Sequence, residues 1–289
     1  MSPRRALLIG LGIVVIGWAL VPAVRGALLV GHGGAAWSGL VEHSEAVTFL
    51  ARDGVRLSGT FVKAPNPAGT IVLVHGFRSG RGEMLDWLTF LYPTYSVLLF
   101  DSRGTGSSEG TFGVGATEDR DIVGAVDLVR ARNQPGSDRI AVLGISLGAG
   151  DAIIAAAHDE RIRAVVADSP WTDEFVQLER MHALAIGPVS VPLLPYEPAL
   201  VAALIGGRLE DAVPAAVVEK IAPRSLLLIH ALDDGNATTP AVGTERLFRF
   251  ARDPKELWLV PTGGHVGAIR AQPTEYRQRV LSFLASALR

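Results

Sequence analysis

The sequence contains no cysteine, and its charges are nearly balanced. The lack of cysteine excludes disulfides, thiolate metal sites, iron–sulfur clusters and a cysteine nucleophile. The 27 basic and 29 acidic side chains leave a formal net charge of -2, so the chain has no electrostatic footprint for nucleic acid. It also lacks the P-loop of phosphate-binding proteins and the H-E-x-x-H motif of zinc proteases. We therefore expect neither a metal nor an organic cofactor.

Hydrophobic residues are abundant, at 48% of the 289 residues, which excludes a largely disordered chain. No charged residue lies between Ala6 and Val24, a run about as long as the roughly 20 apolar residues needed to cross a bilayer. Two arginines precede this run, which favours a cytoplasmic N-terminus and an extracytoplasmic domain. We predict a retained single-pass membrane anchor over residues 1–25, followed by a linker over 26–43. A cleaved signal peptide is the alternative, although its apolar middle is usually shorter.

The remainder, residues 44–289, alternates short apolar runs with amphipathic stretches. The predicted strands cover Ala46–Leu50, Arg56–Val62, Thr70–Val74, Ser96–Phe100, Ile140–Leu143, Ala164–Ala167, Ser225–Ile229 and Glu256–Val260. The predicted helices cover Asp119–Arg132, Leu147–His158, Pro240–Arg252 and Thr274–Leu288. This alternation predicts an α/β protein with an eight-stranded, mostly parallel sheet and helices on both faces. The stretch at about 171–220 breaks the alternation and is predicted to form a small helical cap.

The strongest motif is Gly-x-Ser-x-Gly around Ser146. It follows the apolar run Ile140–Leu143 and opens a predicted helix, which is the strand–turn–helix context of a nucleophile elbow. A serine in this place sits on a sharp turn, and the glycines at 144 and 148 let the strand and the helix approach closely. Ser146 is therefore the candidate nucleophile.

The loop His75–Phe77 follows directly on another predicted strand. A tetrahedral oxyanion needs two N–H donors, usually one from the residue after the nucleophile and one from this earlier loop. The candidate oxyanion hole therefore consists of the backbone amides of Phe77 and Leu147. We interpret His75 as a packing residue that supports the loop. The similar motif at His32–Gly34 follows the membrane segment and is assigned to the linker.

Two adjacent aspartates, Asp233 and Asp234, follow the strand that ends at Ile229. An acid in this place can accept the imidazole Nδ1–H of a catalytic histidine and hold its tautomer. Chemistry alone leaves the choice open, since one of the two would serve as the acid and the other as a turn or helix cap. His265 follows the last predicted strand on a loop with two glycines, and it completes the order serine, aspartate, histidine. It is the candidate base.

From about Glu45 to its end, the chain resembles the α/β-hydrolase fold superfamily, and within it the BEM46-like and prolyl-oligopeptidase-like serine hydrolases. The matching stretches are His75–Ser79, Asp101–Ser108, Gly144–Gly148 and Asp168–Pro170. The resemblance implies an α/β-hydrolase fold with Ser146 as nucleophile, His265 as base and an acid on the loop after Ile229. It favours Asp234, because the acid in such proteins stands four residues after a histidine, here His230. Asp233 stays as the alternative acid, since Ala231 replaces the family's usual glycine.

Three further charged residues receive structural interpretations. Asp168, which follows the strand before the cap, is interpreted as a turn residue. Asp101 and Arg103 are interpreted as the groups that hold the turn Gly104–Gly106.

These residues predict a membrane-anchored serine hydrolase that cleaves a carboxylic ester or thioester by two-step acyl transfer. The expected partner is a small-molecule acyl substrate, and the apolar segments of the cap favour a lipophilic one. A peptidase or amidase of the same fold is one alternative. A non-catalytic, membrane-tethered binding protein is another, because fold does not dictate activity.

Overall fold

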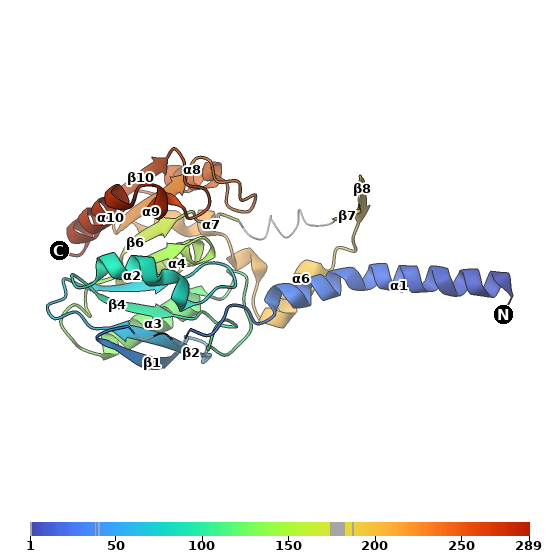
Figure 1. Ribbon diagram of the computed structural model, residues 1–289, viewed down its shortest axis with the longest axis horizontal. Helices are drawn as coiled ribbons and strands as arrows, with labels where there is room; N and C mark the ends of the chain where they lie inside the picture. Colours follow the sequence, from blue (N-terminus) through green and yellow to red (C-terminus); the bar gives the residue numbers. More distant parts are fainter. Residues whose placement is uncertain (1, 38, 40, 174–182, 187) are drawn as a thin grey trace.

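The computed structural model describes residues 2–37, 39, 41–173, 183–186 and 188–289, and it centres on an eight-stranded sheet (Figure 1). In spatial order the strands are β1 (Ser44–Leu50), β2 (Arg56–Val62), β4 (Ser96–Phe100), β3 (Thr70–Val74), β5 (Ile140–Ile145), β6 (Ile162–Asp168), β9 (Ser225–Ala231) and β10 (Lys255–Val260). The pairs β1–β2 and β2–β4 are antiparallel, and every other neighbouring pair is parallel. The predicted mostly parallel sheet and its eight strands are confirmed.

Helices cover both faces of this sheet. One face carries α3 (Asp119–Ala131), α4 (Leu147–His158) and α8 (Ala241–Phe250), and the other carries α2 (Leu85–Leu91), α9 (Ala268–Ala271) and α10 (Pro273–Ala287). The strands alternate between the two cores because successive side chains of a strand point to opposite faces. In β3, for example, Val72 and Val74 join the core under α3 and α4, whereas Ile71 and Leu73 join the core under α2 and α10. Burial on both faces explains why these strands are solid aliphatic runs.

The N-terminal helix α1 (Pro3–Val30) extends away from the sheet domain (Figure 1). Its 28 residues span about 42 Å at the α-helical rise of 1.5 Å per residue. Among the described residues, it is the one helix long and apolar enough to cross a membrane. Its aliphatic side chains are exposed, as at Leu7, which keeps 73% of its accessible surface. The helix continues five residues beyond the predicted anchor boundary at residue 25.

The segment that follows α1 runs back against the domain. Gly33 donates a backbone hydrogen bond to Gly104 O (2.8 Å) and accepts one from Gly106 N (3.0 Å). The Arg78 guanidinium donates to the carbonyl oxygens of Leu28 (2.6 Å) and His32 (3.1 Å). The end of α1 is therefore attached to the loop that follows β3.

The cap is only partly helical in the region that the structure describes. It holds a two-stranded antiparallel sheet, β7 (Ala183–Ile186) and β8 (Val189–Pro192), which the sequence reading did not predict. The helical part comprises α6 (Glu197–Ile205), α7 (Pro214–Val217) and the short 3-10 helices η2 (Leu209–Asp211) and η3 (Val218–Ile221). Outside the cap, a further 3-10 helix, η1 (Arg81–Met84), precedes α2. Each of the two strands has four residues, too few to display a period that distinguishes strand from helix. Residues 174–182 of the predicted cap lie outside the described residues.

Candidate active site

Three side chains that are distant in the sequence meet at the carboxyl edge of the sheet. Ser146 follows β5, Asp234 lies beyond β9 and His265 lies beyond β10. His265 Nε2 lies 2.8 Å from Ser146 Oγ, and His265 Nδ1 lies 2.8 Å from Asp234 Oδ2. Parallel strands end at the same edge, which brings the three loops together. The result is a continuous series of hydrogen bonds from a hydroxyl through an imidazole to a carboxylate.

Ser146 occupies the sharp turn that its glycine flanks predict. Its backbone has φ 52° and ψ −117°, a conformation that non-glycine residues rarely adopt. A Cβ at Gly144 would lie 2.1 Å from Gly148 O, and a Cβ at Gly148 would lie 2.4 Å from His75 O. Both contacts are with backbone atoms that cannot move aside cheaply. The strand, the turn and α4 therefore fit together only with glycine at both positions.

The predicted oxyanion donors are the backbone amides of Leu147 and Phe77. Leu147 is the first residue of α4, and Phe77 lies on the loop after β3. Neither N–H donates a hydrogen bond to another described residue. The loop is held by Gly76 N–H, which donates to Glu83 Oε2 (3.0 Å), and a Cβ built on Gly76 would lie 3.4 Å from Ser146 Cβ. Both amides are thus available to a negatively charged oxygen beside the serine.

This architecture is shared with known proteins. The family model described as X-Pro dipeptidyl-peptidase (S15 family) matches residues 53–186. The uncharacterised protein YqkD of Bacillus subtilis is 30% identical over 236 residues, which cover 80% of this chain and 76% of YqkD. Thiohydrolase aneE of Aspergillus aculeatus is 30% identical over 167 residues, or 56% of this chain and 51% of aneE. The solved structure of Pyrococcus furiosus esterase Pf2001 matches with a TM-score of 0.73 at 24% identity, covering 90% of this chain and 100% of that one.

The chain belongs to the α/β-hydrolase superfamily. The S15 match includes the elbow of this α/β hydrolase but ends before Asp234 and His265. The placement of those two residues therefore comes from the structure and not from that match.

The two adjacent aspartates of this α/β hydrolase have different partners. Asp234 has a fully buried side chain and contacts His265 Nδ1, while its Oδ1 accepts from Asn236 N–H at 2.8 Å. Asp233 Oδ1 instead accepts from the N–H groups of Gly263 and Gly264, both at 2.8 Å. Asp234 contacts the imidazole, and Asp233 holds the loop that carries it.

A second histidine shares Asp234, and sequence reasoning used it only as part of a motif. His230 Nε2 lies 3.0 Å from Asp234 Oδ2, and His230 Nδ1 lies 2.7 Å from Thr244 Oγ1. Burial lowers the pKa of His230, so its neutral form is favoured, with Nε2–H donating to Asp234 and Nδ1 accepting from the Thr244 hydroxyl. Thr239 Oγ1 lies 3.1 Å from His265 Nδ1. The carboxylate of Asp234 is therefore contacted by three groups, the imidazoles of His230 and His265 and the N–H of Asn236.

A cavity of about 300 Å³ opens at Ser146. Its lining combines apolar with charged and polar groups and consists of Gly76, Phe77, Glu83, Asp86, Trp87, Ser146, Asn236, His265, Val266 and Arg270. Sequence reasoning did not find Glu83, Asp86, Trp87, Asn236 or Arg270, because no motif surrounds them.

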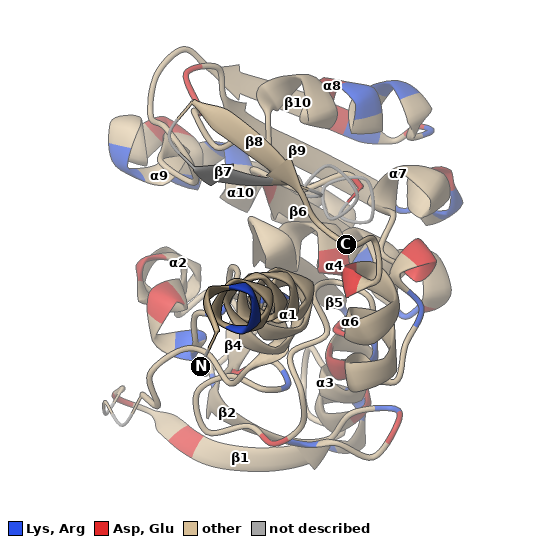
Figure 2. Ribbon diagram, turned by 90° about the vertical axis from the view of Figure 1, so that its right-hand side faces the viewer, with Lys and Arg blue, Asp and Glu red and all other residues tan. Residues whose placement is uncertain are grey.

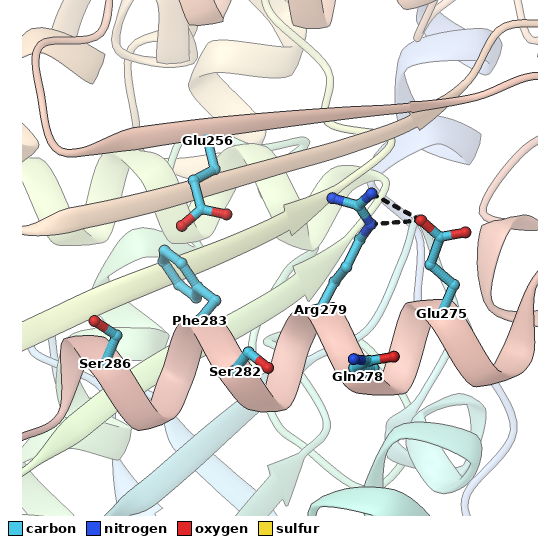
Figure 3. Close-up of a pocket in the computed structure, with 7 residues that line it drawn as sticks. All are labelled: Glu256, Glu275, Gln278, Arg279, Ser282, Phe283 and Ser286. Atoms are coloured by element: carbon cyan, nitrogen blue, oxygen red, sulfur yellow. Dashed lines mark hydrogen bonds and ion pairs between the residues drawn. The ribbon is translucent and has the colours of Figure 1, made fainter.

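A second hollow, of about 380 Å³, lies between β10 and α10 on another part of the domain (Figure 3). Its lining residues are Glu256, Glu275, Gln278, Arg279, Ser282, Phe283 and Ser286, with Arg279 paired to Glu275 (Figure 3). No histidine lines it, so its serines have no imidazole beside them. Within the described part of the chain, no three histidine or acidic side chains gather as a metal site.

The remaining charged residues support the edge of the sheet. Burial raises the pKa of Asp168 to about 6, and its carboxyl accepts from Tyr276 Oη–H at 2.9 Å and from the Ser169 hydroxyl at 3.0 Å. Asp101 accepts from Ser107 N–H (2.9 Å) and so holds the turn at Gly104–Gly106.

Arg103 does not bond this turn through its side chain, contrary to the sequence interpretation. Its guanidinium pairs with Asp53 and Asp121, both at 2.7 Å. His75 is buried, and its Nδ1 lies 2.8 Å from Gly76 O while its Nε2 accepts from Ser102 N–H at 3.0 Å. Burial lowers the pKa of His75, so it links these loops as a neutral group.

Proposed function

We propose that this α/β hydrolase is a membrane-anchored serine hydrolase that cleaves carboxylic esters or thioesters. Ser146 is the nucleophile, His265 the general base and Asp234 the acid that orients the imidazole. The observation that supports this most is the pair of 2.8 Å hydrogen bonds that joins the three side chains. Bonds of this length and order are what general-base activation of a serine requires.

The reaction proceeds in two steps. His265 Nε2 removes the Ser146 proton as Oγ attacks the carbonyl carbon, and the amides of Phe77 and Leu147 donate to the oxyanion that forms. The same imidazolium protonates the leaving alcohol or thiol, and the acyl group stays on Ser146. His265 then activates water, which releases the carboxylic acid and restores the serine. Asp234 takes up no proton in either step, since its carboxylate only orients and stabilises the imidazolium.

The choice of ester or thioester is supported by two similar proteins, thiohydrolase aneE and esterase Pf2001. The cavity offers a second candidate. Glu83 and Asp86 line it close to Ser146, and carboxylates there would attract an amine such as the free N-terminus of a peptide. The X-Pro dipeptidyl-peptidase match is consistent with such a substrate.

Helix α1 is proposed as a retained anchor, with the catalytic domain outside the cytoplasm. Its length, its exposed aliphatic surface and the two arginines at its start support this orientation. Protease treatment of intact and opened membrane vesicles tests it. Digestion of the domain by protease added on the cytoplasmic side of intact vesicles would contradict the orientation. Release of a chain that lacks its first 25 residues would contradict the anchor.

A fluorophosphonate probe tests the chemistry directly, because it reacts with activated serines. We expect labelling of the full chain and its loss in Ser146→Ala, while the matched control Ser282→Ala keeps it. Labelling that survives in Ser146→Ala, or no labelling of folded protein, would defeat the proposal and favour a binding protein. A panel of p-nitrophenyl esters, thioesters and dipeptidyl p-nitroanilides then separates the ester from the peptide candidate.

A further inference from the structure

Part of the cap lies along α1 and away from the sheet. We call β7, β8 and α6, with the residues between β8 and α6, the arm; it comprises residues 183–186 and 188–205. Trp18 Nε1–H donates to Pro192 O at 3.0 Å, and the Tyr196 hydroxyl donates to Ala19 O. In Figure 1, α6 lies beside the domain end of α1, and β7 and β8 lie further out along the same helix. The arm is therefore docked on the proposed membrane anchor.

The arm is almost free of charge. Among residues 183–205, Glu197 is the one charged side chain, and it pairs with Arg25 of α1 at 3.6 Å. Both side chains are largely covered, with 11% and 22% of their surface accessible. The contact beside them is tight, since a Cβ on Gly26 would lie 3.3 Å from Val201 Cγ2. Figure 2 shows the uncharged course of α1 and β8, with basic residues at the near end of α1.

The position of the arm on α1 gives its depth in a membrane. Trp18 lies six residues before Val24, the end of the charge-free run, and this corresponds to about 9 Å along the helix. Monotopic elements bury their apolar faces about 5–10 Å into the boundary between headgroups and acyl chains. Tryptophan and tyrosine, which make two of the contacts between the arm and α1, are the side chains enriched at that depth.

The composition of the arm fits such a place. The apolar side chains of Val189 and Leu204 keep 58% and 44% of their surface accessible. The arm contains four prolines, at 188, 192, 195 and 198, which have no backbone N–H. The arm therefore has fewer backbone donors that would lack a hydrogen-bond partner in lipid. The Trp18 and Tyr196 bonds satisfy two further carbonyl oxygens.

The same arrangement fixes where the catalytic cavity opens. Phe77 lines the cavity, is 46% exposed and directly precedes Arg78, whose guanidinium bonds the Leu28 and His32 carbonyls at the end of α1. The rim of the cavity is thus attached to the point at which α1 leaves the proposed bilayer.

We propose that the arm is a second, shallow membrane element, which inserts into the lipid leaflet that α1 leaves and holds the cavity at the bilayer surface, where it receives acyl substrates from the lipid. This rests on the proposed function in two respects, since it takes α1 as a retained anchor and the cavity at Ser146 as the site of acyl transfer.

Depth-dependent quenching tests the proposal on the full chain in vesicles of phosphatidylcholine with a minority of phosphatidylglycerol. Because the chain has no cysteine, a single cysteine carries the only label. The variants are Val189→Cys and Leu204→Cys on the arm, Val14→Cys on α1 as positive control and Val242→Cys on α8, which is 62% exposed, as negative control. With a polarity-sensitive fluorophore attached, nitroxide-labelled lipids should quench the fluorescence at positions 14, 189 and 204 and leave the fluorescence at 242 unchanged.

Quenching at position 14 with as little quenching at positions 189 and 204 as at 242 would overturn the arm as a membrane element. If neither aqueous iodide nor nitroxide-labelled lipids quench positions 189 and 204, a protein partner or a second copy covers the arm, and the membrane proposal is overturned. No quenching at 14 would overturn the anchor and the arm together. Fluorophosphonate labelling of Ser146 in the same samples is independent of these results, so a failure of the chemistry is told apart from a failure of the arm.

A functional readout sharpens the test. The double variant Val189→Asp with Leu204→Asp should lose turnover several-fold on a long-chain ester dissolved in the vesicles and keep its turnover on soluble p-nitrophenyl acetate. Val242→Asp is the matched control and should keep both. Unchanged turnover of the vesicle ester in the double variant would contradict the proposal.

Discussion

The two halves of the candidate active site are held by different forces. The elbow half, formed by the loop after β3 and by Ser146 at the start of α4, depends on backbone contacts that leave no room for a Cβ at Gly144 or Gly148. The acid–base half, formed by the loops after β9 and β10, depends on side-chain hydrogen bonds to Asp233 and Asp234. The first half is fixed by sterics and the second by polar partners.

This difference determines how each half should respond to change. A steric fit fails as a whole when a methyl group is added, because backbone cannot retreat without unfolding its neighbours. A network of hydrogen bonds fails by degrees, since each lost bond removes a limited part of the orientation. Substitutions of the elbow glycines should therefore show mainly in stability, and mutations in the acid–base half mainly in turnover.

The largest expected effect separates the two aspartates. Asp234→Asn should lower kcat by about ten-thousandfold, because an amide in this place favours the wrong imidazole tautomer. Asp233→Asn keeps a carbonyl oxygen for the two glycine N–H groups and should lower kcat less than about tenfold. Turnover of p-nitrophenyl esters measures both. Equal losses in the two variants would remove the distinction between acid and loop support.

The next effect concerns the elbow. Gly144→Ala places a Cβ 2.1 Å from Gly148 O and should lower the free energy of unfolding by about 3 kcal/mol or more. Gly235→Ala is the matched control, since nothing lies within 4 Å of its Cβ and the change should be small. Urea unfolding of the full chain in detergent compares the two. A Gly144→Ala protein as stable as Gly235→Ala would show that the elbow relaxes, contrary to a steric origin.

The third effect is a dependence of stability on pH. Burial raises the pKa of Asp168 from 3.8 to about 6, so the folded chain holds this proton more tightly than the unfolded chain. The contribution of Asp168 to the free energy of unfolding is therefore complete below about pH 4 and is lost as pH rises through about 6, by about 3 kcal/mol in total. Asp168→Asn should remove this part of the slope.

Unfolding of both proteins from pH 4 to pH 7 gives the comparison. Glu118 and Asp121, whose pKa values burial raises to about 7 and about 6, contribute a slope of the same sign in both proteins, so only the difference reports on Asp168. Parallel curves for the two proteins would contradict the assignment.

The smallest expected effect concerns His230. Removing its bond to Asp234 in His230→Phe should lower kcat about ten- to a hundredfold with little change in KM, because a hydrogen bond to a charged group contributes about 1.5–3 kcal/mol. His230→Gln can still donate to the carboxylate and should recover part of this loss. If Gln were no better than Phe, His230 would act through packing rather than through the bond.

The steric half was predictable from the sequence, and much of the polar half was not. The Gly-x-Ser-x-Gly motif predicts the turn directly, because the two glycines that must approach closely, Gly144 and Gly148, are only four residues apart in the chain. The choice of Asp234 over Asp233 depended on a resemblance, since neighbouring aspartates look alike until the loop at 263–264 is placed beside them. The bond between His230 and Thr244 joins β9 to α8, and no local pattern indicates it.

The cap illustrates a different limit. Its strands β7 and β8 have four residues each, so periodicity could not distinguish them from helix. The docking of the arm on α1 joins Trp18 to Pro192, which are 174 positions apart, and a single sequence carries no signal for such a contact.

The contact between Arg78 and the end of α1 has a practical consequence. Arg78 has φ 48°, an uncommon backbone conformation for arginine, and its guanidinium is held by the Leu28 and His32 carbonyls. A chain shortened to begin at residue 44, the usual route to a freely soluble sample, lacks both of these acceptors. Phe77, whose amide we propose as an oxyanion donor, would lose its neighbour's restraint, and rates measured on such a fragment would understate those of the full chain.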